Sequence, residues 1–405
     1  MRPSMRILFV SNEYPPDTGF GGIGTYTAYA ARCFSSEGHE VDVICRSADG
    51  RAHGREDSAV RIHRIPPGTF PLPGGRMWYP LRRVCRYVMP RTLEKLAWAR
   101  EAFREYLRLR ESGLEFDVIE FPECNAEGFF FTRAGVTGTV VRLHTPWETV
   151  RTLDRIPEHP VDRFLLGRLE RSAARRAFGV SSPTRALAAD LRSRWSLGHV
   201  EVYPNPLPVG DFEPTRGGGW IYVGRIEHRK GVHLLLESYA LLRSRRSLPP
   251  LLLLGRAYGC LADGMEYGDY IRNRINRAGL TETVTWNPGV SGSEVSGYLR
   301  SASLAIFPSL WENFSYACLE AMACGLAVVA ARCGGYPEIL EENRSGMLFE
   351  VGDSEDLARV LEVLLDDASL VSRLGSEARI RVHHLCDPTV VYGHAGRWYR
   401  NVAGR

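Results

Sequence analysis

The feature that most constrains the fold is an alternation of apolar, strand-like runs with helical segments, which occurs twice along the chain. Near the start, Met5–Ser11 (MRILFVS) is continuously apolar, as expected of a strand buried on both faces. A helical segment ending at Gly38 follows, and then a second strand-like run, HEVDVICR. Because strand–helix–strand units build parallel sheets, the pattern predicts an α/β fold.

The second half of the chain restarts the same alternation. A proline-rich stretch near Pro204–Pro214 separates the halves, and 405 residues are many for one domain. We therefore predict two doubly wound, Rossmann-like domains, 1–208 and 209–386, facing each other across a cleft where ligands bind at the carboxyl ends of strands. The predicted strands of the second domain are GWIYVGRI, PLLLLGR, ETVTWNPG, ASLAIFPS and LAVVAAR.

Composition and cysteine usage exclude several classes of function. A formal net charge of +4 is too small to argue for a nucleic-acid partner. Nine cysteines without a C-x-x-C pair argue against a disulfide framework or a zinc site. The first apolar run is too short for a signal peptide, and no run approaches the roughly 18 apolar residues of a membrane helix. These observations predict a cytoplasmic protein.

A charged helical stretch, Leu81–Ser112, is rich in arginine. One interpretation is a membrane-surface helix that binds anionic lipid. The other is a solvated face, and we favour it because the apolar stripe is ragged. Peripheral membrane contact through 81–112 is therefore possible but not favoured. Acidic partners for the arginines are present at Glu94, Glu101, Glu105 and Glu111.

The stretch Pro308–Leu340 contains two glutamates with seven residues between them. Glu320 stands in an apolar helical run, where a carboxylate is costly to bury unless donors meet it. Glu312 precedes that helix, and Asn313 or Ser315 could cap it. Because a helix N-terminus attracts phosphate, this stretch predicts an anion site flanked by carboxylates.

Arginine replaces lysine almost everywhere in this chain, and only Lys95 and Lys230 remain. Lys230 follows a predicted strand in VGRIEHRKG, where it and Arg225 suit a diphosphate by charge and geometry. We expect the intervening residues 228–229 to be an ordinary surface loop. Lys95 stands on the charged helical stretch and is interpreted as incidental.

A glycine-rich loop follows the first strand, and its residues Gly19, Gly21, Gly22 and Gly24 fit G-x-G-x-x-G. Seven residues separate it from the strand, and the second strand ends in Cys45-Arg46 rather than an acid, so a dinucleotide enzyme is disfavoured. The loop could still bring backbone N–H groups against a phosphate.

Together these residues resemble the retaining nucleotide-sugar glycosyltransferases of the GT-B fold, family GT4. The resemblance implies a donor site mostly in the second domain and an acceptor site mostly in the first. It also implies that the last helix, within 387–405, packs back onto the first domain. The motifs that carry it are the E-x7-E stretch with EAMACGLAVVA and GGYPEIL, VGRIEHRKG, PSLWE, GFGG and YPNP.

The resemblance also implies roles for individual residues. Arg225 and Lys230 would hold the diphosphate and neutralise the leaving group, Glu320 would bind the ribose hydroxyls, and Glu312 would lie beside the transferred sugar. The usual Gly-Phe-Gly after the first glutamate is Asn-Phe-Ser here, and a usual proline is Ala327. Further implied contacts are backbone N–H groups of Asn313, Phe314 and Ser315, the glycines Gly21 and Gly22 near the diphosphate, and His144 at the sugar.

The expected reaction is transfer of a sugar from a nucleoside-diphosphate sugar to an unidentified acceptor, with retention of configuration. No D-x-D triplet occurs, so we expect neither a metal nor another cofactor. The acceptor could be a small molecule, a glycan or a lipid-linked compound, with Trp78–Tyr79 and Thr145–Pro160 as candidate walls. The alternatives are a sugar-nucleotide 2-epimerase, a phosphorylase with pyridoxal phosphate, and a non-catalytic nucleotide-sugar binding module.

Overall fold

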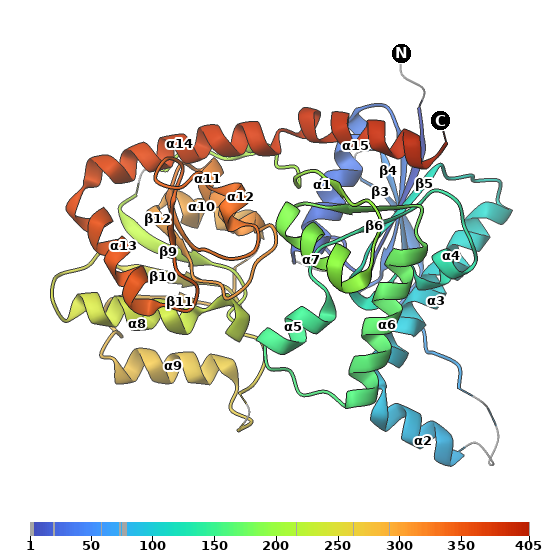
Figure 1. Ribbon diagram of the computed structural model, residues 1–405, viewed down its shortest axis with the longest axis horizontal. Helices are drawn as coiled ribbons and strands as arrows, with labels where there is room; N and C mark the ends of the chain where they lie inside the picture. Colours follow the sequence, from blue (N-terminus) through green and yellow to red (C-terminus); the bar gives the residue numbers. More distant parts are fainter. Residues whose placement is uncertain are drawn as a thin grey trace. The chain divides into compact units, whose positions relative to one another are not determined.

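The computed structural model describes residues 4–18, 21–57, 59–72, 74, 79–215, 217–261, 263–290 and 292–404. Within these ranges the chain forms two compact units, each built on its own sheet with helices around it (Figure 1). Unit 1 comprises 1–149, 158–206 and 388–405, and unit 2 comprises 150–157 and 207–387. The prediction of two Rossmann-like α/β domains is confirmed.

The sheet of unit 1 has eight strands in the order β3-β4-β2-β1-β5-β6-β7-β8. All neighbours are parallel except β3, which pairs antiparallel with β4 at the edge. The strand order reverses between β1 and β5, which makes the space after these two strands a topological switch point. The strands are β1 (Arg6–Ser11), β2 (Glu40–Arg46), β3 (His53–Asp57), β4 (Val60–Ile65), β5 (Val118–Pro122), β6 (Thr139–Arg142), β7 (Gly179–Ser182) and β8 (Glu201–Val202).

The charged stretch 81–112 forms two helices rather than one, because Pro90 begins a new helix after Val88. The second of these, α3, buries Trp98, Tyr106 and Leu109 on one face. Its exposed arginines pair with glutamates, Arg104 with Glu101 and Arg108 with Glu105, as expected of a solvated charged face. The first, α2, buries none of its residues. The helices of unit 1 are α1 (Gly22–Ser36), α2 (Tyr79–Val88), α3 (Pro90–Glu111), α4 (Phe129–Arg133), α5 (Trp147–Leu153), α6 (Pro160–Arg176), α7 (Arg185–Trp195) and α15 (Pro388–Val402); α5 extends into unit 2.

The last helix, α15, belongs to unit 1 and packs on α1. The ring of Tyr399 stacks on Phe34 with centroids 5.1 Å apart, and Tyr392 meets the same ring edge-on at 4.6 Å. The hydroxyl of Tyr399 also donates to the buried carboxyl group of Glu120 in β5. Aromatic contacts and one buried hydrogen bond therefore hold the end of the chain on the first sheet.

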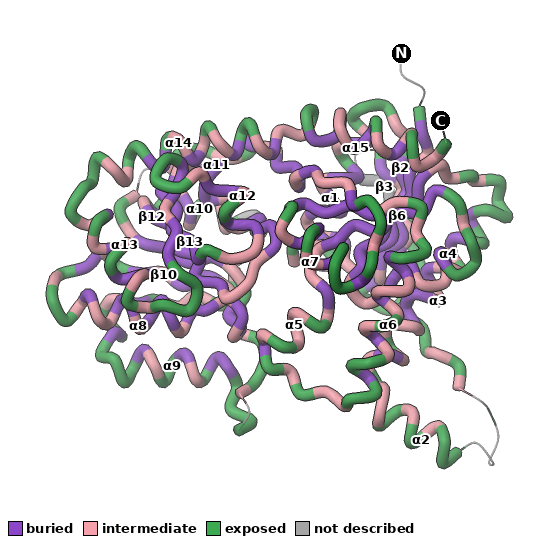
Figure 2. The backbone as a smooth tube through the Cα atoms, in the orientation of Figure 1, coloured by how far each residue is buried: buried purple, intermediate pink, exposed green. Residues whose placement is uncertain are grey.

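Unit 2 contains a six-stranded parallel sheet in the order β11-β10-β9-β12-β13-β14, with its switch point between β9 and β12. Figure 2 shows its strands as the buried centre of the unit. The elements are β9 (Gly219–Val223), α8 (Val232–Arg243), β10 (Leu251–Leu254), α9 (Tyr267–Arg277), β11 (Val284–Asn287), α10 (Gly292–Arg300), β12 (Ala302–Phe307), α11 (Tyr316–Ala323), β13 (Ala327–Ala331), α12 (Tyr336–Ile339), β14 (Met347–Phe349), α13 (Ser354–Asp366) and α14 (Ala368–Cys386).

The segment 150–157, placed in the first domain by the sequence, is part of unit 2. The carboxylate of Asp154 accepts a hydrogen bond from the backbone N–H of Arg229 at 2.7 Å, and the Leu153 carbonyl bonds to His228 Nδ1 at 2.8 Å. These bonds fix the segment to the loop after β9. The candidate acceptor wall 145–160 is therefore shared between the units, and Trp78 of the other candidate wall lies outside the described residues.

Among the described residues, no helix is long and apolar enough to cross a membrane.

Candidate functional site

Two segments singled out in the sequence meet at the switch point of unit 2. The loop 224–231 follows β9, and the loop 308–315 follows β12, the neighbouring strand. The N–H of Leu310 donates to the carbonyl of Arg229 at 2.7 Å and ties the loops together. Gly231 has φ +69°, and a Cβ there would lie 1.9 Å from the Pro308 carbonyl oxygen, so only glycine fits this approach.

Arg229 is the buried centre of this loop pair, which corrects the expectation that it lies on an ordinary surface loop. Its side chain is only 4% exposed. The guanidinium bonds to Glu227 and to the Trp311 carbonyl (3.1 Å), and it lies 3.5 Å from Asp154 and 3.9 Å from Glu312. Burial opposes its charge, but the three carboxylates outweigh burial and raise the pKa of Arg229.

The two residues assigned to the diphosphate differ in their surroundings. Lys230 is 15% exposed and its ammonium group pairs with the carboxylate of Glu312. The Arg225 side chain is half-exposed and lies 3.2 Å from Glu227. Burial would raise the pKa of Glu312, but Lys230 and then Arg229 overcome it and hold this pKa below its ordinary value. Glu312 is therefore ionised at neutral pH.

The turn that replaces the usual glycines is tightly built. Asn313 is buried, and its backbone N–H donates to the carboxylate of Glu312 at 3.2 Å. Ser315 caps α11 by accepting from Cys318 N–H at 3.4 Å. Within the described part of the chain, the N–H groups of Phe314 and Ser315 have no acceptor. Two free backbone donors therefore stand at the start of α11.

Glu320 lies in α11, four residues after the first residue of the helix, and is half-buried. Burial alone raises the pKa of its carboxyl group to about 7. No ion pair or hydrogen bond to this carboxyl group occurs among the residues that the structure describes. An unpaired carboxyl group in an apolar helix is costly, and donors from a bound molecule would offset that cost.

The glycine loop of unit 1 contains a carboxylate that the sequence analysis missed. Gly21 and Gly22 begin α1, while Gly19 of the motif lies outside the described residues. The Glu13 carboxylate accepts from the N–H of Gly24 at 3.4 Å, and a Cβ on Gly21 would lie 3.0 Å from the same oxygen. Glu13 thus occupies a position at this helix N-terminus that was expected to suit phosphate.

His144 follows β6 in unit 1. Its ring meets Tyr26 edge-on at 5.2 Å, and its backbone N–H donates to Glu123 at 2.7 Å. Burial, and then the charge of Arg142, lower the pKa of His144 to about 3. The imidazole is therefore neutral at physiological pH and can act as a hydrogen-bonding group but not as a cation.

Comparison with known families now adds to this geometry. The model for "Glycosyl transferases group 1" matches residues 217–381, and the model for "Glycosyl transferase 4-like domain" matches residues 21–206. The chain belongs to the GT4-type glycosyltransferases. The first of these matches contains the loop 224–231 with Arg225 and Lys230 and both glutamates of the E-x7-E stretch, Glu312 and Glu320. The second contains Gly21, Gly22 and His144.

Curated proteins similar to this glycosyltransferase align over most of its length. The D-inositol 3-phosphate glycosyltransferase of Arthrobacter sp. (strain FB24) is 28% identical over 402 residues, covering 93% of this chain and 90% of that protein. The MMP alpha-(1->4)-mannosyltransferase of Mycolicibacterium hassiacum is 27% identical and covers 93% of each chain.

Solved structures similar to this glycosyltransferase share its GT-B fold. Sucrose-phosphate synthase from Thermosynechococcus elongatus has a TM-score of 0.78 at 21% identity, covering 98% of this chain and 99% of that one. Anabaena HepE in complex with UDP-glucose has a TM-score of 0.70 at 16% identity, covering 98% of this chain and 100% of the other.

The structure brings one group of predicted site residues of this glycosyltransferase together in unit 2. The group comprises Arg225, Lys230, Glu312, Asn313, Phe314, Ser315 and Glu320. Sequence reasoning missed Arg229 and Asp154. The only signal for Arg229 was its position between His228 and Lys230 in the motif, and no sequence pattern pointed to Asp154. Among the described residues, no three His, Cys, Asp or Glu side chains are grouped so that they could hold a metal ion.

Proposed function

We propose that this protein is a retaining, metal-independent glycosyltransferase that moves a sugar from a nucleoside-diphosphate sugar to a hydroxyl group of its acceptor. The observation that carries the proposal is that the loop 224–231, with the cations Arg225 and Lys230, lies beside the free N–H groups of Phe314 and Ser315 at the start of α11. Positive charge and uncommitted backbone donors are what a diphosphate leaving group requires. HepE, bound to UDP-glucose, and starch synthase IV of Arabidopsis thaliana, bound to ADP, support this donor class.

Arg225 and Lys230 are assigned to the diphosphate. As the bond between the anomeric carbon and the phosphate oxygen breaks, negative charge builds on the leaving group, and these cations stabilise it more than the ground state. Lys230 is paired with Glu312, so its ammonium group is held in position at the site. Arg229 acts as a positioning residue, because its guanidinium fixes both the loop and Glu312.

Glu312 is assigned to the transferred sugar and Glu320 to the ribose. An ionised Glu312 can accept hydrogen bonds from sugar hydroxyls while it stays paired with Lys230. The unpaired carboxyl group of Glu320 would receive the two ribose hydroxyls as donors. The free N–H groups of Phe314 and Ser315 are assigned to phosphate or sugar oxygens, and Asn313 contributes chiefly by fixing Glu312.

The contributions of unit 1 are further parts of the proposal. Gly21 and Gly22 are assigned to the neighbourhood of the diphosphate. The hydrogen bond from the Gly24 N–H to the Glu13 carboxylate would have to break before this N–H could bind a phosphate oxygen. The neutral imidazole of His144 is assigned to a hydroxyl of the transferred sugar. For retention, the acceptor oxygen attacks the face from which the diphosphate departs, and its proton passes to the departing phosphate oxygen.

A thermal-shift panel of UDP, GDP, ADP and dTDP tests the donor assignment. A ligand at 100 times its Kd stabilises the folded state by about 2.7 kcal/mol, so the matching nucleotide raises the melting temperature. Lys230→Met should remove this shift, whereas Arg277→Met, a change on an exposed face of α9, should keep it. If nucleotide raised the melting temperature of folded Lys230→Met as much as that of the wild type, the phosphate assignment would be contradicted.

Product analysis tests the rest of the proposal. NMR of the glycoside product should show the donor's anomeric configuration at the new bond, and EDTA should leave turnover unchanged. Loss of turnover in EDTA with recovery on adding Mg²⁺ would refute metal independence. Conversion of the donor to its 2-epimer without an acceptor would establish the epimerase alternative instead, and nucleotide-sugar binding without any turnover would establish a binding module.

A further inference from the structure

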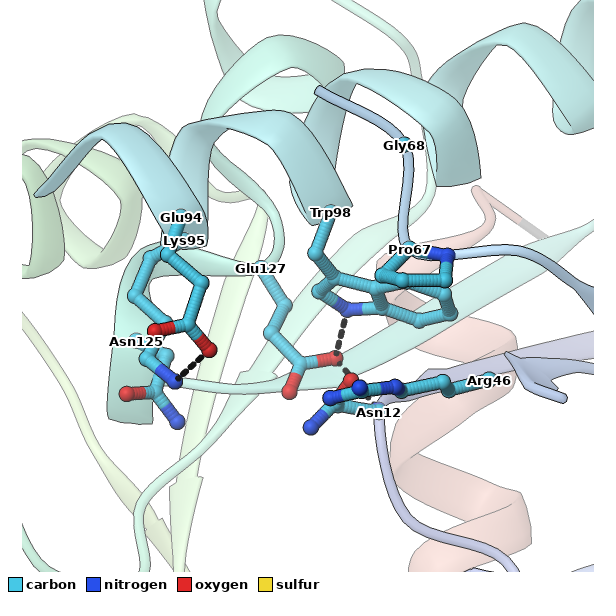
Figure 3. Close-up of a pocket in the computed structure, with 9 residues that line it drawn as sticks. All are labelled: Asn12, Arg46, Pro67, Gly68, Glu94, Lys95, Trp98, Asn125 and Glu127. Carbon is cyan, nitrogen blue, oxygen red and sulfur yellow. Dashed lines mark hydrogen bonds and ion pairs between the residues drawn. The ribbon is translucent and has the colours of Figure 1, made fainter. Parts of the chain in front are cut away.

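Unit 1 contains a polar cavity of about 180 Å³ at its own switch point (Figure 3). Asn12 directly follows β1 and Asn125 lies three residues after β5, the two strands between which the strand order reverses. Arg46 ends β2, and the roof comes from α3. Ligands of doubly wound sheets bind at this place. The lining residues are Asn12, Arg46, Pro67, Gly68, Glu94, Lys95, Trp98, Asn125 and Glu127.

The carboxyl group of Glu127 is held rigidly in the cavity wall. One of its oxygens accepts from the backbone N–H of Asn12 and from the indole N–H of Trp98, both at 2.9 Å. Figure 3 shows the other oxygen of the same group pointing away from these donors. Burial raises the pKa of Glu127 to about 8, so at neutral pH this group is mostly protonated and can donate as well as accept.

The charges around the cavity leave a positive excess. Lys95, one of the chain's two lysines, lies 3.1 Å from Glu94 and is neutralised by it. The guanidinium of Arg46 has no acidic partner among the residues described. With Glu127 protonated, the balance of these groups is one positive charge, which suits one anionic group on a ligand.

The remaining polar groups are free to bind. The side-chain amides of Asn12 and Asn125 have no partner within the described ranges, and each amide offers donors and an acceptor. Asn125 has φ +65°, a left-handed conformation that asparagine adopts at a cost. The volume equals roughly six water molecules at about 30 Å³ each, the scale of one six-membered polyol ring.

Resting on the proposed transfer to a hydroxyl group, we propose that this cavity binds the acceptor as a single polyol ring, a sugar or cyclitol, that carries one anionic substituent. Ring hydroxyls bond to Asn12, Asn125 and Glu127, and the anionic substituent pairs with Arg46. This assignment also gives Lys95 a place in a site, in contrast to the expectation that it is incidental.

Calorimetry on the full chain tests the assignment with glucose 6-phosphate, mannose 6-phosphate and inositol 1-phosphate, each beside its unphosphorylated parent. We expect saturable binding of at least one phosphorylated ring, tighter than that of its parent. Arg46→Gln should weaken it about 10- to 100-fold, because a charge-assisted hydrogen bond is lost. Asn125→Gly should weaken it about 2- to 10-fold by removing an amide while keeping a conformation that glycine tolerates.

Asn343→Gly is the matched control, because Asn343 has φ +61° on the exposed surface of unit 2. This variant should bind the phosphorylated ring as the wild type does. Binding by none of the phosphorylated rings, or equal binding by Arg46→Gln, overturns the assignment. Nucleotide binding measured on the same samples separates the two proposals. If the wild type binds no nucleotide, the donor assignment is refuted. If it binds a nucleotide but none of the phosphorylated rings, only the cavity assignment is refuted.

Discussion

Replacing Arg229 by methionine should destabilise unit 2 severely, although sequence analysis gave this arginine no role. The change leaves Glu227, Asp154 and Glu312 without the guanidinium that lies among them. Breaking a buried ion pair by removing one partner costs about 3–5 kcal/mol. A second estimate of this loss of stability gives a similar value. The variant could relieve one orphaned carboxylate by protonating it, and protonating a carboxyl group with a usual pKa of roughly 4.3 costs about 3.7 kcal/mol at pH 7.

Differential scanning calorimetry of the whole chain measures this effect. For a unit of this size, each kcal/mol lowers the melting temperature by roughly 2–4 °C, so Arg229→Met should lower it by about 6–20 °C. Lys230→Met removes a neighbouring cation that is more exposed, and it should lower the melting temperature much less. Arg229→Lys should be intermediate, since it restores the charge but not the planar fork.

The pH dependence gives a second check with a defined sign. The pKa of Glu312 is depressed in the folded protein, so its stabilising contribution is present above the unfolded value and is lost as the pH falls through the folded value. In Arg229→Met the orphaned carboxylates can protonate more cheaply at pH 5 than at pH 7. The difference in melting temperature between Arg229→Met and the wild type should therefore be smaller at pH 5 than at pH 7. Equal melting temperatures of Arg229→Met and Arg277→Met at pH 7 would refute the assignment of Arg229 as the buried centre.

Three further outcomes follow from the geometry. Gly334→Ala should destabilise unit 2 and impair turnover, because Gly334 has φ +52° and a Cβ would lie 1.9 Å from the Glu312 carbonyl oxygen; a normal melting curve would contradict this. Nucleotide affinity, measured by isothermal titration, should rise with pH up to about 7 and then level off, because burial raises the pKa of Glu320 to about 7 and the ionised form accepts ribose hydroxyls. Glu320→Gln should bind the nucleotide weakly at every pH and should not show this rise. Tyr399→Phe should lower the melting temperature by leaving the buried Glu120 carboxyl group without one of its donors, and hydrogen exchange should show faster opening of α15.

The sequence was sufficient to predict the two α/β domains, because continuously apolar strands alternate with helices in both halves. It also predicted that VGRIEHRKG and the E-x7-E stretch belong to one site, and the structure joins them through Lys230 and Glu312. Both segments follow strands at a switch point, so local pattern and parallel topology together define where their side chains lie.

Other features depend on contacts that local patterns do not contain. The burial of Arg229 requires Asp154, which is 75 residues away and was assigned to the other domain. The cavity of unit 1 requires α3 to cover the ends of β1 and β5 with its buried face, and the ragged apolar pattern of this arginine-rich helix did not indicate such a contact. Likewise, Glu13 reaches the α1 N-terminus only because the loop after β1 folds back. In each case the partner is distant in sequence, and neither periodicity nor capping rules specify it.

Glu312 and Glu320 show how one stretch produces two different carboxyl groups. Both are partly buried, but cations surround Glu312 and lower its pKa, whereas burial alone acts on Glu320 and raises its pKa to about 7. The protein therefore supplies the compensation for Glu312 from its own Lys230 and Arg229. For Glu320 the compensation has to come from a bound molecule that offers hydrogen-bond donors. A ligand bearing a pair of hydroxyl groups meets that requirement, and its binding should release a proton near pH 7, which titrations in buffers of different ionisation enthalpy would detect.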